Sequence, residues 1–527
     1  MLSVVIEIGV ILTFSVLIRL LFGLSFKRSM LDDSYNHLFY IKTQQNKKYF
    51  DFTFYGALIK SKIAYPRFQH FIISRFPQRK WFLVGNILII FYDIVQVVLV
   101  YGLSKYLFEV IHVDQAVNTT MILSPAGWSA LLFSSTPALF PVSARLTGLG
   151  NARTIGNLFV FLLMFVWMFI QLNGFFYLLP VAFLLVCLII LTSQFALQTM
   201  LFNFIFLSIF YLSIIPILFV VLSIVIAFFL PIGVNDILYF KFNHWKWFFK
   251  NAQEGTTVNN RNKVKDFIYL PVYFVKDINF FLYKIINHLT PAILLYSVPS
   301  IIIYFVNWGV FEGNLFLTYF NYIFLASLLS FGLTSLKPFS FLGEAERYME
   351  YSMSFLSVLI VELMLLGHIS EKMLMLLFII HLSIIFFIFT YRNQKYLPAI
   401  GMKEEDKNEV LEPLIQFLKP EKEVNVLVVP IKHSRYLAYK TFEIEHIKFY
   451  QRFMNPEKGY ESFTKETKKG SIEIPITDIS FFKKKYNVNY LLFLKSFEAF
   501  NEDLLNEFNV SRLELVFENE TYLLFKV

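Results

Sequence analysis

Long apolar runs, separated by short polar segments, fill the first 391 residues of the chain. A helix needs about 20 mostly apolar residues to cross a hydrocarbon core of roughly 30 Å, and runs of this length recur. We therefore expect an all-α polytopic membrane domain over residues 1–391. The pattern predicts about eleven transmembrane helices, near residues 4–24, 82–108, 120–141, 154–172, 175–192, 194–211, 213–232, 288–307, 313–336, 353–368 and 371–391.

Two connections are too long and too polar to be turns. Residues 25–81 contain two amphipathic pieces, around Asp33–Gln45 and Phe68–Phe76. Residues 233–287 mix aromatic side chains with lysines, which is typical of a segment in the lipid headgroup region. Elsewhere, Pro137 and Pro141 fall in the helix expected at 120–141; we interpret them as an ordinary kink, with a break of the helix as the alternative.

The pattern changes after residue 391. Residues 392–423 are charged and indicate a linker, and residues 424–527 indicate a small soluble α/β domain. Val424–Ile431 is rich in β-branched residues, as buried parallel strands are, and Tyr490–Leu494 predicts a second strand before a terminal hairpin. Because no glycine-rich phosphate loop precedes a helix here, the sequence predicts no nucleotide site.

Composition supports a membrane setting and narrows the chemistry. Apolar residues make up 57% of the chain and charged residues only 16%, well below the share in soluble proteins. The net charge of +9 is dispersed, which argues against nucleic acid and favours membrane lipids as partners. Cys187 is the single cysteine, and His288, His368 and His381 lack metal-ligand spacing, so we expect no metal site. Glu362 stands out as an acid inside a predicted span, and its role stays open.

The strongest local signal is Asp32-Asp33-Ser34-Tyr35-Asn36-His37, directly after the first apolar run. If a helix begins at Ser34, the two aspartates cap it, and capping alone is one explanation. A cap needs only one acid, however, which favours a catalytic carboxylate at the membrane surface. Asp33 and His37 are one helical turn apart. We therefore take Asp33 as the catalytic residue, with Asp32 as the alternative.

A second polar cluster, Ala64-Tyr65-Pro66-Arg67-Phe68-Gln69-His70-Phe71, heads the next amphipathic piece. With the first cluster it resembles the GT-C superfamily of membrane glycosyltransferases. In that family an acidic motif opens the first extracytoplasmic loop, and a Tyr-Pro-Pro-like motif introduces the second juxtamembrane helix. Asp32-Asp33 matches the first motif and Tyr65-Pro66 the second, with Arg67 in place of the second proline. The resemblance covers residues 25–80 in motif and the rest of the chain in layout.

The resemblance implies an enzyme of the cell membrane that takes a sugar from a polyprenyl-phosphate-linked donor. The acceptor is a lipid, glycan or protein at the extracytoplasmic face, and Asp33 or Asp32 is the base. The segment Gly343–Tyr348 offers further contacts, because arginine binds phosphate oxygens in a bidentate way; a solvated loop with an internal ion pair is the alternative. Together the substrate-binding candidates are His37, Tyr65, Arg67, His70, Arg145, Arg153, Glu344, Glu346, Arg347 and Tyr348.

The distribution of positive charge and the family resemblance predict opposite orientations in the membrane. Residues 25–81 hold eleven lysines and arginines and residues 233–287 hold eight, which the positive-inside rule would place in the cytoplasm. We follow the resemblance, which puts the first loop and the C-terminal domain outside. The alternative functions are a transporter or flippase of lipid-linked sugars and a glycan polymerase or ligase. The sequence requires no cofactor and leaves a divalent cation open.

Overall fold

The structure is a computed structural model of the chain. It describes residues 4–25, 32–45, 58, 66–111, 122–139, 152–251, 263–287, 289–342, 345–395, 404–450, 466–468, 473–497 and 499–527. The chain divides into two compact units. The helical unit comprises residues 1–27, 83–230 and 261–398, and the sheet unit comprises residues 28–82, 231–260 and 399–527. The expected first loop therefore groups with the C-terminal part of the chain.

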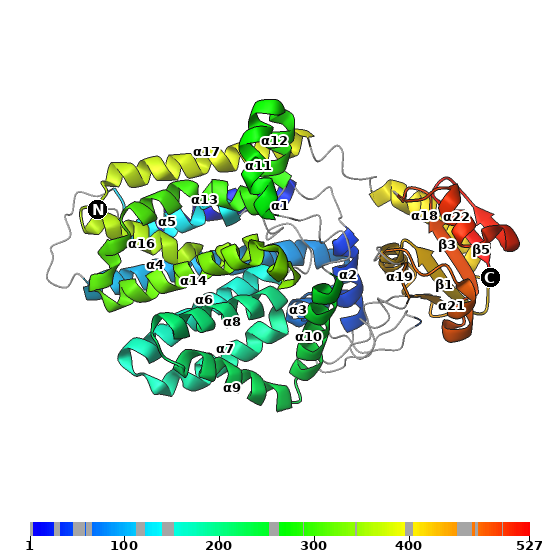
Figure 1. Cartoon of the computed structure of the whole chain (residues 1–527), viewed down its shortest axis with the longest axis horizontal. Coiled ribbons are helices and arrows are strands. Elements are labelled where there is room, and N and C mark those ends of the chain that lie inside the picture. The colour runs from blue at the N-terminus through cyan, green and yellow to red at the C-terminus, as the bar shows by residue number, and fades with distance from the viewer. Residues whose placement is uncertain are drawn as a thin grey trace. The chain divides into compact units, whose positions relative to one another are not determined.

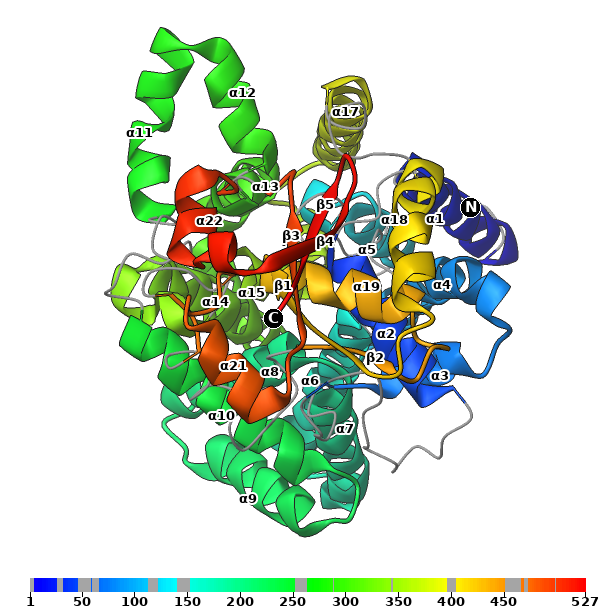
Figure 2. The same cartoon turned by 90° about the vertical axis from the view of Figure 1, so that its right-hand side faces the viewer.

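The helical unit is built from apolar helices, most of which run alongside one another (Figure 1). The short α5 packs on α16, and α14 packs on both α8 and α16. Helices α11 and α12 form a hairpin (Figure 2). The helices are α1 (Val4–Ser25), α4 (Trp81–Ile111), α5 (Pro125–Ser134), α6 (Arg153–Asn173), α7 (Leu179–Thr192), α8 (Gln194–Phe210), α9 (Ile215–Phe229), α11 (Lys263–Lys276), α12 (Ile278–Asn287), α13 (Leu289–Val306), α14 (Leu315–Ser335), α15 (Glu346–Glu350), α16 (Met353–Leu365) and α17 (Glu371–Lys395).

The apolar helices indicate a membrane protein, but the count of eleven spans is not confirmed. Within the described ranges, five helices are long and apolar enough to cross a membrane, or six if Ile215–Phe229 and Val234–Asn243 form one broken span. A helix lies at every position where a span is expected, yet α5 has only 10 residues and α7, α8 and α16 have 14, 17 and 13. Prolines and neighbouring polar residues end these four helices early. For example, α5 stops at Ser134, and a 3₁₀ turn at Pro137–Leu139 follows.

The sheet unit contains a five-stranded sheet in the order β2-β1-β3-β5-β4. Strands β1 (Val424–Val429), β2 (Ile447–Phe449) and β3 (Tyr490–Leu494) are parallel, and β5 (Tyr522–Lys526) runs antiparallel to both β3 and β4 (Glu514–Glu518). All six residues of β1 are buried, as befits a strand covered on both faces. The small C-terminal sheet is confirmed, with its two parallel strands β1 and β3 and its terminal hairpin.

The helices of the sheet unit come from three separate segments of the chain. Besides α18 (Glu404–Leu418), which occupies part of the expected linker, the sheet has α19 (Ser434–Lys440), α21 (Ile479–Tyr486) and α22 (Glu502–Glu507). The core on one side of the sheet takes Phe482 of α21 and Leu504 of α22, with Leu58 from the first loop packed against it. The remaining helices of this unit are α2 (Asp32–Gln44), α3 (Phe68–Ser74) and α10 (Val234–Asn251).

Candidate functional site

The predicted catalytic acids open α2. The helix begins at Asp32, two residues before Ser34, so both aspartates lie in its first turn and not ahead of it. Acidic residues are favourable there because the helix N-terminus carries a partial positive charge. Positions 33 and 37 lie one turn apart on the helix, as expected. The backbone therefore presents Asp33 and His37 along one stripe of α2.

Two of the predicted substrate-binding residues, His37 and His70, contact each other. Nδ1 of His37 lies 2.8 Å from Nε2 of His70, and the two rings are stacked, with centroids 5.1 Å apart. Tyr40, three residues after His37, meets the His70 ring edge-on at 5.5 Å. Because His37 and His70 are 33 residues apart in sequence, this pair is made by the packing of α2 on α3.

Burial holds the His70 ring neutral. Its side chain is fully buried, and this desolvation lowers the pKa of His70 well below its ordinary value of 6.5. A positive charge on His37 acts in the same direction, whereas a hydrogen bond to the Pro66 backbone opposes it. One of two facing ring nitrogens must donate and the other accept. The pair therefore tolerates one proton between its facing nitrogens and is broken when both are protonated.

Arg67 lies in the same part of the sheet unit, at the N-cap position of α3. Its side chain is only 1% exposed, so it is not a solvated surface charge. Tyr65, the first residue of the predicted Tyr-Pro motif, lies outside the described residues, while Pro66 is buried. The described part of this motif thus belongs to the interior of the unit that also contains α2.

In the helical unit, two more predicted residues converge on one aromatic ring. The guanidinium carbon of Arg347, from α15, lies 4.0 Å from the ring centroid of Phe195, and that of Arg153, from α6, lies 6.0 Å from it. Phe195 is the second residue of α8, whose N-cap is Ser193. Gly156 allows α6 to approach closely, since a Cβ there would meet the Ser193 Cβ at 2.8 Å.

The other residues of the segment 343–348 are placed unequally. Tyr348 is buried, and its hydroxyl donates to the Leu342 carbonyl at 3.3 Å. Glu346 is the first residue of α15. Glu344 and Arg145 lie outside the described residues. Nothing in the sequence singles out Phe195, because a phenylalanine in a chain with 64 of them carries no local signal.

The predicted site residues thus fall into two groups. Asp32, Asp33, His37, Arg67 and His70 belong to the sheet unit, while the second group belongs to the helical unit and consists of Arg153, Glu346, Arg347 and Tyr348. Each group contains a pair that the fold brings together. That the acids face the arginines across a shared cavity stays a prediction.

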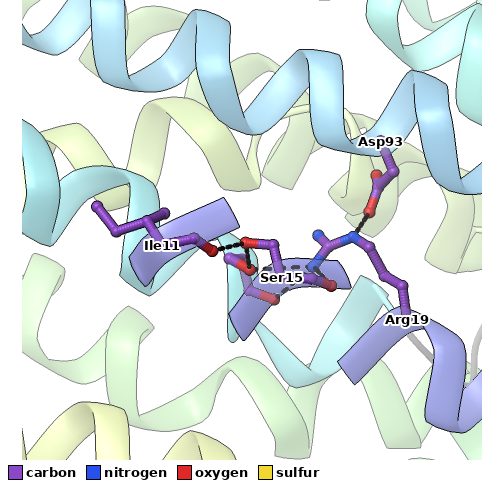
Figure 3. Close-up of polar contacts among 5 residues, drawn as sticks. Ile11, Ser15, Arg19 and Asp93 are labelled. Carbon is purple, nitrogen blue, oxygen red and sulfur yellow. Dashed lines mark hydrogen bonds and ion pairs between the residues drawn. The ribbon is translucent and has the colours of Figure 1, made fainter. Parts of the chain in front are cut away.

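The expectation that Glu362 stands out among charges inside the apolar helices is wrong. Arg19 of α1 and Asp93 of α4 form a buried ion pair, with side chains 0% and 2% exposed. The guanidinium also donates to the Ser15 carbonyl at 3.1 Å (Figure 3). A further hydrogen bond runs from it to the Ser134 hydroxyl at 3.0 Å. Both charges lie in apolar runs of the sequence, so the signal was present: an ionisable residue inside a predicted span.

Helix α1 complements both ends of the short helix α5. At the start of α5, the Glu7 carboxylate accepts a hydrogen bond from the Ser124 backbone N–H at 2.7 Å. At its end, Arg19 lies against the Ser134 carbonyl at 3.4 Å. A negative charge at a helix N-terminus and a positive one at its C-terminus both offset the helix dipole. This arrangement satisfies the ends of a helix too short to span the membrane alone.

His381 of α17 is a further polar side chain near the end of α5. Its two ring nitrogens lie 3.4 Å from the Ser135 hydroxyl, just after α5, and 3.2 Å from the Ser300 hydroxyl of α13. The imidazole borders a small pocket that Thr136 and Ser297 also line. The His381 side chain is buried, as a histidine in a protein core is.

Neither a metal centre nor a known relative adds to this site. Within the part of the chain that the structure describes, no three His, Cys, Asp or Glu side chains are grouped as a metal site requires. No model of a known protein family matches the chain, and no curated protein matches it. The resemblance to the GT-C superfamily therefore remains one of motif and layout.

Proposed function

We propose that the protein is a multi-pass membrane glycosyltransferase that moves a sugar from a polyprenyl-phosphate-linked donor to a lipid, glycan or protein acceptor at the extracytoplasmic face. The observation that carries the phosphate side of this proposal is the pair Arg153 and Arg347 on one aromatic ring. Arginine lies favourably over an aromatic face, and its planar guanidinium is the side chain best suited to bind phosphate oxygens in a bidentate way.

The acceptor side of the proposal rests on α2. Asp33, or Asp32 beside it, takes the proton of an acceptor hydroxyl, whose oxygen then attacks the anomeric carbon of the sugar. The bond from that carbon to the phosphate oxygen breaks, and polyprenyl phosphate leaves with the electron pair. The arginines stabilise the charge that develops on the leaving phosphate. The contact of His37 with the buried His70 supports this role because it ties α2 to α3.

The test is sugar transfer by purified protein in detergent or liposomes, supplied with a polyprenyl-phosphate-linked sugar and an acceptor extract. We expect the variant with both Asp32→Asn and Asp33→Asn to lose transfer by a factor of about 100 or more, as the loss of a general base does. Glu109→Gln, an exposed acid on α4, is the matched control and keeps full activity. Full transfer by the double variant contradicts the assignment.

A transporter or flippase of lipid-linked sugars is the second candidate. The buried pair of Arg19 and Asp93 beside the short helix α5 favours it, because charges inside membrane helices often mark a transport path. The two functions separate in a sealed-vesicle assay. A transporter moves the intact donor from one leaflet to the other, whereas a transferase changes it chemically.

A further inference from the structure

The C-terminal sheet has the topology that places a ligand site in many α/β proteins. From β1 the chain continues to β2 on one side, whereas from β3 it continues to β4 and β5 on the other. In open α/β sheets, ligands bind at the carboxyl ends of the strands where the connections diverge in this way. In this sheet that place lies between the ends of β1 and β3.

A cluster of aromatic side chains, most of them buried, lies at this place. His433 follows β1, and its Nε2 lies 3.0 Å from the hydroxyl of Tyr522, which pairs with the last residue of β3. Tyr436 packs on the His433 ring. Tyr35, from α2, completes the cluster by meeting the Tyr436 ring edge-on at 4.6 Å. Tyr35 and Tyr522 are 2% and 3% exposed, and this burial, together with the nearby Tyr436 and Tyr35, raises the pKa of Tyr522.

Two more side chains extend this contact along α2. The ring of Phe39 lies 5.9 Å from that of Phe442. The Lys42 ammonium donates to Glu443 at 2.9 Å and lies 5.3 Å from the Phe442 ring centroid. Tyr35, Phe39 and Lys42 have the spacing of one helix face, and this face packs on α19 and the turn after it.

A different stripe of α2 carries the proposed chemistry. His37 and Tyr40 contact His70 of α3, and position 33 precedes His37 by one turn. Helix α2 is therefore held between α3 and the C-terminal domain, which contacts it through a face that does not bear His37.

We propose that the C-terminal α/β domain is a positioning domain for the catalytic helix. Tyr35 takes the place at the strand ends that a small ligand would occupy, and Lys42 and Glu443 fix the position of α2 along its axis. This inference rests on the proposed transferase function, since it assigns the domain the task of holding Asp33 against the acceptor. Tyr35, Lys42 and Glu443 are positioning residues and do not touch substrate.

A charge-reversal series on the full-length protein tests this role. Lys42→Glu and Glu443→Lys each place like charges together, and we expect backbone amides of residues 35–44 to exchange with deuterium about five- to tenfold faster. Transfer should fall through kcat, with the donor KM little changed. The variant with both substitutions restores opposite charges and should recover both properties. Lys42→Met, which keeps an apolar stem on Phe442, is a milder variant.

The matched control is Lys495→Glu, which breaks an exposed pair with Glu518 in the same domain. It should leave exchange in α2 and transfer unchanged. If the double reversal fails to restore slow exchange, or if single reversals leave exchange and kcat unaltered, the positioning role is overturned. A different outcome is that the protein shows no transferase activity but the variants change deuterium exchange as expected. That result would overturn the proposed enzyme function and still support the contact by which the C-terminal domain positions α2.

Discussion

The buried carboxylate of Asp93 should contribute more to the stability of the helical unit than an exposed charge does. Asp93 is the partner of Arg19, and both side chains are buried among apolar helices. Asp93→Asn leaves a guanidinium that cannot lose its proton in a protein interior. Breaking a buried ion pair by removing one partner costs about 3–5 kcal/mol. We expect the free energy of unfolding to fall by about that amount.

The opposite change should cost less, although it removes the same pair. In Arg19→Met the remaining carboxyl of Asp93 is able to take up a proton and become neutral, so no charge is left without compensation. The change still removes the contacts of Arg19 with the Ser134 hydroxyl and carbonyl, which together are worth about 2 kcal/mol. Arg19→Met combined with Asp93→Leu should lie near the Arg19→Met value, because two apolar side chains can replace a buried pair.

The assay is equilibrium unfolding by titration with a denaturing detergent, with all variants in the same bicelles. Glu109→Gln on α4 is the control, since Glu109 and Lys105 form an exposed pair at 4.0 Å and such pairs contribute less than about 1 kcal/mol. If Asp93→Asn costs no more than this control, or if the effects at Arg19 and Asp93 simply add, the two side chains do not form a buried, energetically coupled pair.

Three further predictions concern other contacts. Burial lowers the pKa of His70, so the stability that the neutral ring contributes is complete above pH 6.5 and is lost as the pH falls below that value. The loss is at most about 1.4 kcal/mol per pH unit. Deuterium exchange in α3 should rise over the same pH range, and His70→Phe should remove this pH dependence. Arg347→Lys keeps the charge but not the stacked fork on Phe195, so the donor KM should rise roughly tenfold, whereas an unchanged KM would place the phosphate elsewhere. Glu7→Gln removes the charge at the start of α5 and should lower the unfolding free energy by about 1 kcal/mol, measured in the same titration.

Sequence periodicity was sufficient for the elements but not for their lengths or contacts. Hydrophobic runs located the apolar helices and the buried strands β1 and β3, because burial on both faces requires continuous apolar stretches. Strands β4 and β5 were located by the hairpin pattern instead, since no residue of β4 is buried. Helix α5 ends early at Ser134, although the sequence around it is apolar. The polar side chains of Ser134 and Ser135 and the ring of Pro137 disfavour its continuation. Strand β2, with three residues, is too short to leave a pattern.

The sequence drew attention to several residues that contact one another in the structure, but not to their pairings. His37 and His70 each stand in a recognisable polar cluster, yet their contact depends on the docking of α2 against α3. The contact of Lys42 with Glu443 joins residues 401 positions apart, which no local pattern reveals. The ion pair of Arg19 with Asp93 could have been inferred, since two opposite charges within apolar runs must find a partner.

The most direct test of the proposed function is the fate of a polyprenyl-phosphate-linked sugar incubated with the purified protein and no acceptor. Water then replaces the acceptor hydroxyl, and we expect slow release of free sugar and polyprenyl phosphate, abolished when Asp32 and Asp33 are both changed to Asn. A donor that remains intact in solution but moves between the leaflets of sealed vesicles would contradict the transferase and identify a transporter.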